Sequence, residues 1–211
     1  MSYDEIGPYQ ANFDDLRHLH QPSLGRSQKC AILVRGLDPY IEYRDLLDQI
    51  RNTGRIFHIR IIRPHEYGPN DTAQARIVMW DVRSRKNLQI KLDSPEFGYQ
   101  HPRVRHEYDS YCIPPRPRNI STDSRVIRLK GTYGLVCRDT IYENLSNAEF
   151  FYYPVDITDP IQEGESHYIT DVIFASYHNL AQTAYGIFGD IYRNKGVTVS
   201  FGVDPCVPLE E

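Results

Sequence analysis

Apolar positions in the first half of the chain switch between continuous runs and helical spacing. Ala31–Val34 is a continuous apolar run and Ile56–Ile62 is rich in β-branched residues, so both stretches predict strands. Between them apolar residues recur at helical spacing up to Gly54, which predicts an amphipathic helix that ends there. The remaining predicted elements are a third strand at Ala73–Trp80, a second helix capped by Asp81, and a fourth strand at Arg103–Tyr108. The expected order is therefore βαββαβ.

The same order of elements repeats in the second half of the chain. Arg125–Gly131 parallels the first strand and its glycine exit, and Thr140 with Glu143 has the spacing of a capping box. The other expected elements are a helix with Ile141 and Leu145, a second strand at Phe150–Tyr153, an acidic loop over residues 156–165, a third strand at Ile169–Ser176, a helix carrying Ala181, Ala184, Tyr185 and Phe188, and a last strand at Gly196–Phe201. This internal duplication predicts two tandem domains.

The expected fold class is α+β, with two ferredoxin-like domains that each have a four-stranded antiparallel sheet and two helices on one face. Pro114–Arg118 is rich in proline and favours an extended connection between them, or alternatively a docking ligand for another protein. The predicted boundaries are a flexible N-terminal tail at 1–27, a first domain at 28–109, a Pro/Arg linker at 110–123, a second domain at 124–204 and a C-terminal tail at 205–211.

The first strand also carries a family motif. Ile32–Leu37 resembles the first-strand hexamer of the RNA recognition motif (RRM), whereas the third strand departs from the family's aromatic octamer. Met79–Arg83 is similar to the strand-to-helix junction of the Mei2-like RRMs. The resemblance implies a sheet whose open face binds single-stranded RNA. It implies no catalysis.

The register of the third strand decides which residues that open face presents. If Trp80 were the last core residue, Gln74 and Arg76 would be buried, at a cost of several kcal/mol for each group left unpaired. We therefore expect Ala75, Ile77 and Met79 to face the core, and Gln74, Arg76 and Val78 to face outward. Leu33, Gln74 and Arg76 then occupy the usual base-stacking positions, so RNA contacts in this domain should be mainly electrostatic.

In the second domain both registers of the third strand bury apolar residues. From the helix spacing we expect Ile173 and Ala175 to face inward and Val172 and Phe174 to face outward, which would place Phe174 where it could stack on a base. The residues predicted to contact RNA are Arg35, Arg60, Gln74, Arg76, Arg103, Arg105, Tyr108, Tyr111, Arg116, Arg118, Arg128 and Phe174.

Charge is distributed unevenly behind the formal net charge of −4. Residues 28–109 hold 14 Lys and Arg against 11 Asp and Glu, whereas residues 124–204 hold 6 against 10. The first domain and the linker are thus the expected electrostatic footprint for RNA. The acidic second domain would add either base stacking or a site for a protein partner. The alternative for the whole chain is a protein-interaction module that docks a peptide or another domain.

Motifs for other kinds of chemistry are absent from the sequence. There is no phosphate-binding glycine loop, no HExxH motif and no nucleophile motif, and the four cysteines are scattered without zinc-ligand spacing. We expect no enzyme activity, no cofactor, no metal site and no small-molecule substrate. The sequence also lacks an apolar run of membrane-spanning length and a secretion signal, so we expect an intracellular protein with no membrane contact.

Overall fold

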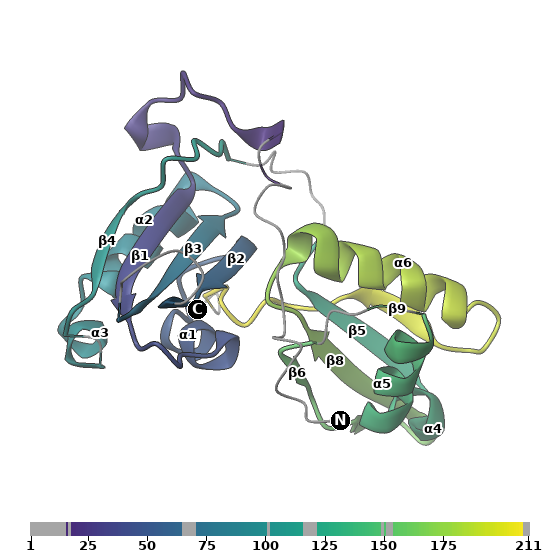
Figure 1. Ribbon diagram of the computed structural model, residues 1–211. Helices are drawn as coiled ribbons and strands as arrows, with labels where there is room; N and C mark the ends of the chain where they lie inside the picture. Colours follow the sequence, from purple (N-terminus) through teal and green to yellow (C-terminus); the bar gives the residue numbers. More distant parts are fainter. Residues whose placement is uncertain are drawn as a thin grey trace. The chain divides into compact units, whose positions relative to one another are not determined.

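The computed structural model divides the chain into two compact units (Figure 1). One unit is built on residues 12–121 together with 204–211, and the other on residues 122–203. The residues that the structure describes are 16, 18–64, 71–100, 102–115, 122–148, 150 and 154–208. The C-terminal residues around 204–208, which were expected to form part of the second domain and a tail, thus belong to the first unit.

The first unit is an antiparallel sheet with helices on one face. Its elements are a short 3-10 helix η2 (Arg26–Gln28), β1 (Ala31–Leu37), α1 (Tyr43–Gln49), β2 (Ile56–Ile62), β3 (Ala73–Met79), α2 (Val82–Leu92), α3 (Pro95–Gln100) and β4 (Arg105–Tyr108). The strand order is β2-β3-β1-β4. Asp81 caps α2, because its side chain accepts a hydrogen bond from the Ser84 amide at 2.8 Å. The predicted βαββαβ order is therefore confirmed, with α3 as an addition.

The predicted register of β3 is also confirmed. Ala75, Ile77 and Met79 are buried, while Gln74 and Arg76 are partly exposed. Val78 lies on the same side as Arg76, as expected, but it is only 1% exposed. Part of the open face is therefore closed to solvent.

The second unit has a similar sheet with a divided edge strand. Its elements are β5 (Val126–Gly131), α4 (Tyr133–Val136), α5 (Arg138–Asn147), β6 (Asp156–Ile157), β7 (Ile161–Glu163), β8 (His167–Ile173), an irregular helical segment η4 (Tyr177–Ala181), α6 (Gln182–Ile191) and β9 (Thr198–Phe201). The sheet order is β6-β8-β5-β9, and β7 pairs with β8 as well. Both units therefore have the RRM-like arrangement of strands and helices.

The edge strand of the second unit lies later in the sequence than predicted. Phe150 is buried and lies outside any strand, and residues 151–153 fall outside the described residues. The stretch expected to be an acidic loop instead forms β6 and β7, which together occupy the edge beside β8. Pro160 separates them because proline has no amide hydrogen to donate to the ladder. Acidic side chains suit an edge strand, since they discourage pairing with other chains.

The expected outward position of Phe174 is wrong. In β8, Val172 lies directly opposite Ile127 of β5, so both side chains point into the core. Phe174 follows two residues later on the same side and is 0% exposed, with its ring edge-to-face against Phe150. Ile173 faces the other way and is partly exposed. Because apolar residues occur on both sides of this strand, pairing with β5 decides the register.

Candidate nucleic-acid interface

The open face of the first domain, the side of its sheet opposite α1 and α2, consists of three cross-strand rows. Residues directly opposite each other in antiparallel strands point to the same side, so the strand register defines the rows. The outer row is Arg105, Arg35, Gln74 and Ile62; the middle row is Glu107, Leu33, Arg76 and Arg60; the inner row is Ala31, Val78 and His58. The inner row is buried, whereas Arg35 and Arg105 are exposed. Accessible positive charge is therefore concentrated in the outer row.

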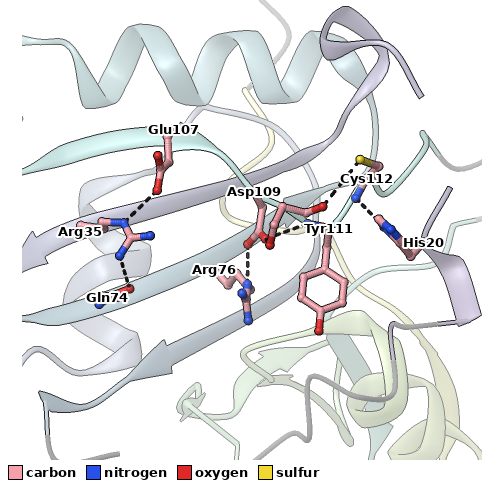
Figure 2. Close-up of polar contacts among 9 residues, drawn as sticks. His20, Arg35, Gln74, Arg76, Glu107, Asp109, Tyr111 and Cys112 are labelled. Carbon is pink, nitrogen blue, oxygen red and sulfur yellow. Dashed lines mark hydrogen bonds and ion pairs between the residues drawn. The ribbon is translucent and has the colours of Figure 1, made fainter. Parts of the chain in front are cut away.

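Arg35 is held at the centre of the outer row by two side chains. Its Nε donates to Glu107 Oε1 at 2.9 Å and its Nη1 donates to Gln74 Oε1 at 3.3 Å (Figure 2). The Arg35 and Glu107 side chains are 49% and 56% exposed, so this ion pair is weakly stabilising and can exchange for another anion. Arg105 lies opposite Arg35 in the register. Within the described ranges, the side chains of Arg103 and Arg105 have no ion-pair partner.

Arg76 has a different environment in the middle row. It pairs through Nε with Asp109, whose carboxylate is fully buried, while the Arg76 side chain is 18% exposed (Figure 2). The same carboxylate accepts hydrogen bonds from the Tyr111 amide at 2.9 Å and from Ser110 Oγ at 3.2 Å. The guanidinium of Arg76 also lies 4.9 Å from the centroid of the Tyr111 ring. Its charge is thus largely committed inside the protein, and Arg60 beside it is only 8% exposed.

Tyr111 is placed beside the open face by contacts with the N-terminal segment. The Cys112 amide donates to His20 Nδ1 at 2.9 Å, and the Gln21 amide donates to the Cys112 carbonyl at 2.9 Å. The rings of His20 and Tyr111 meet edge to face at 5.7 Å (Figure 2). Tyr111 is half-buried and borders the middle row through its contact with Arg76.

One further predicted residue, Tyr108, lies away from the open face. Tyr108 pairs with the core residue Ile32, and its hydroxyl accepts a hydrogen bond from Arg85 of α2 at 3.0 Å, so it faces the helices rather than the open face. Residues 116 and 118 lie outside the described residues. Sequence reasoning missed Asp109 as the partner of Arg76. The alternation of Glu107, Tyr108 and Asp109 was the available signal, because a period of two sends both carboxylates to one side.

The open face of the second domain is neutralised by its own ion pairs. Arg128 donates to both carboxylate oxygens of Asp171, each at 2.8 Å, and this hydrogen bonding raises the pKa of Arg128. Lys130 pairs with Glu163 of β7. Phe174, the predicted stacking residue of this domain, is in the core instead. The part of the chain that the structure describes contains no cluster of three or more His, Cys, Asp or Glu side chains suited to a metal ion.

Comparisons with known proteins give only low similarity. No family model and no curated protein matches the chain. Among solved structures it is similar to RNA recognition domains 1 and 2 of Drosophila melanogaster Sex-lethal, at 14% identity and a TM-score of 0.29 over 82% of this chain and 99% of that one. The first two RRM domains of yeast Pub1 are 16% identical, with a TM-score of 0.32, over 82% of this chain and 99% of that one. The three N-terminal RNA-binding domains of the yeast splicing factor Prp24 are 13% identical, with a TM-score of 0.30, over 85% of this chain and 69% of that one.

None of the described helices is both long and apolar enough to cross a membrane. The chain's own strand orders carry the assignment of fold, since both sheets place the first and third strands of the domain in the centre with the second and fourth at the edges. The protein thus consists of two tandem RRM-like domains.

Proposed function

We propose that the protein binds single-stranded RNA, without catalysis, on the outer row of its first domain. The observation that carries this proposal is the group of exposed arginines at one end of the open sheet. Arg35 and Arg105 face each other across β1 and β4, and Arg103 lies two residues before Arg105, the first residue of β4. The domain holding them has a net charge of +3, as counted over residues 28–109. Arginine guanidinium groups form charge-assisted hydrogen bonds to the phosphate oxygens of nucleic acids.

The arrangement suggests a division of roles among these side chains. Arg103 and Arg105 would contact phosphates, and Arg35 would exchange Glu107 for a phosphate oxygen. The Gln74 amide, beside Arg35, would hydrogen-bond to a base edge. Tyr111 at the border of the middle row would support a stacked base. Arg76 would act indirectly, by keeping Tyr111 and Asp109 in place.

The second domain is better suited to contact a protein. Its charged open-face residues are paired with one another, and Ile161 of β7 is 68% exposed directly opposite Ile169 of β8. An exposed isoleucine beside satisfied ion pairs offers little to a phosphate backbone but can pack against a polypeptide. This second role rests on that surface alone and is independent of RNA binding by the first domain.

Replacing Arg105 by alanine is expected to weaken RNA binding about fivefold, which corresponds to losing a contact of about 1 kcal/mol. The slope of log affinity against log salt concentration should fall by about 0.7, the value for one phosphate contact on a single strand. Fluorescence anisotropy with mixed-sequence single-stranded RNA at several salt concentrations measures both quantities. Arg83→Ala is the matched control, because Arg83 is an exposed arginine on α2. Equal losses for the two variants would contradict a site on the open face.

Replacing Glu107 by glutamine should have the opposite effect. The change removes the carboxylate that competes for Arg35 and keeps the shape of the side chain. RNA affinity should rise about two- to fivefold, and the salt slope should become steeper by about 0.7. The same anisotropy titration, with a duplex of equal length as the competitor, checks whether the gain is specific for single strands. Unchanged or weaker binding would exclude Arg35 as a phosphate contact.

A further inference from the structure

The chain returns to the first domain after it has completed the second. Residues 204–211 belong to the compact unit formed by residues 12–121, although they follow the last strand of the other unit. Asp204 is 3% exposed and Cys206 is 0% exposed. Both residues are therefore removed from water, and a carboxylate in particular needs specific partners there.

Asp204 and Cys206 contact the connection between α1 and β2. Asp204 Oδ2 accepts a hydrogen bond from the Ile56 amide at 3.3 Å, and the Cys206 carbonyl accepts one from the Gly54 amide at 2.6 Å. The Cys206 thiol donates to the Leu47 carbonyl at 3.8 Å. Two amide hydrogens at the start of β2 and one carbonyl of α1 are therefore satisfied by residues from the far end of the chain.

The segment is held in shape by its own hydrogen bonds. Asp204 Oδ1 accepts from the Cys206 amide at 2.9 Å, and the Asp204 carbonyl accepts from the Val207 amide at 2.9 Å. Pro205 lies between them and restricts the backbone of the turn. The result is a compact turn whose carboxylate and carbonyl both reach the first domain.

Gly54, which donates to the Cys206 carbonyl, occupies a position where only glycine fits. Gly54 has a φ of +119°, and a Cβ placed there would lie 2.2 Å from Ser84 Oγ, so only glycine fits. At this same position the Gly54 amide donates its hydrogen bond to the Cys206 carbonyl. Buried amide groups are rarely left unpaired in folded proteins, and removing their partners is costly.

We infer that residues 204–207, here named the C-terminal clip, are a structural part of the first domain. The second domain is then an insertion within the first, connected to it at both ends. This inference is independent of RNA binding.

Asp204→Ala in the full chain tests the clip. The single tryptophan, Trp80, follows β3 of the first domain, so its fluorescence reports unfolding of that domain. The urea midpoint of this transition should fall by about 1 M, and the amide hydrogens of Gly54 and Ile56 should exchange at least about tenfold faster. Asp190→Ala is the matched control, because Asp190 is an exposed aspartate that pairs with Arg193 in the second domain. It should leave both quantities unchanged.

A milder variant keeps the test decisive if Asp204→Ala does not fold. Asp204→Asn retains one carbonyl oxygen as an acceptor. Its urea midpoint should therefore be lower than that of the wild type, and the amide hydrogens of Gly54 and Ile56 should exchange faster than in the wild type. Exchange rates at Gly54 and Ile56 that equal the wild-type rates in the folded variant overturn the inference, whatever the midpoint. RNA is absent from these measurements, so their failure would leave the proposed function untouched.

Discussion

Replacing Arg76 by alanine is expected to lower the free energy of unfolding of the first domain by about 3 kcal/mol. The change leaves the Asp109 carboxylate buried without its cation, and breaking a buried ion pair from one side is strongly destabilising. The Tyr111 ring also loses the guanidinium packed against it. Urea unfolding followed by Trp80 fluorescence measures the loss.

Two further variants isolate the cause of this effect. Arg35→Ala removes an arginine from an ion pair that is about half exposed on the same face, and should cost less than about 1 kcal/mol. Arg76→Ala combined with Asp109→Asn removes the uncompensated charge, and should recover part of the stability. A loss for Arg76→Ala no larger than that for Arg35→Ala would show that Arg76 is an exposed surface arginine, as the sequence suggested, rather than a structural residue.

Replacing Phe174 by alanine is expected to destabilise the second domain by about 3–5 kcal/mol. Phe174 is completely buried, and its truncation leaves a cavity next to Phe150 and the other core side chains. Hydrogen exchange in peptides covering β5 and β8 measures this loss, because these two strands pair along their length in the centre of the sheet.

A second substitution of the same residue, Phe174→Leu, distinguishes a core role from a base-stacking role. Tyr185→Ala is the control, because Tyr185 stacks on Phe201 at 4.5 Å but is 37% exposed, so its loss should cost about 1 kcal/mol. RNA affinity of the folded Phe174→Leu variant should equal that of the wild type. Weaker binding with unchanged hydrogen exchange would instead restore Phe174 as a base-stacking residue.

Charge pairing explains why the list of predicted RNA contacts becomes shorter in the structure. The sequence places Arg35, Arg76 and Arg128 on open sheet faces, and the structure confirms that placement. Each one nevertheless pairs with a carboxylate: Arg35 and Arg128 with one on the neighbouring strand, and Arg76 with Asp109, which follows β4. The burial of that carboxylate then decides whether the arginine can exchange it for phosphate. Of these three ion pairs, only Arg35–Glu107 has both side chains more than 40% exposed.

Local patterns in the sequence determined much of the fold. The bounds of β2 at Ile56–Ile62 agree with the prediction, since a β-branched run between a glycine and a proline marks both of its ends. The register of β3 was also predictable, because only one choice avoids burying Gln74 and Arg76. The repeat of the element order indicated two domains of the same fold before any contact was known.

Tertiary structure decided the features that depend on contacts between distant residues. The register of β8 was ambiguous because apolar residues occur on both of its faces, and pairing with β5 places Phe174 in the core. The burial of Asp109 beneath Arg76 and the docking of Asp204 on the start of β2 join positions that no local period relates. Hydrophobic periodicity specifies which side of an element is buried, whereas the partner that satisfies a buried charge or amide is specified only when the chain has folded.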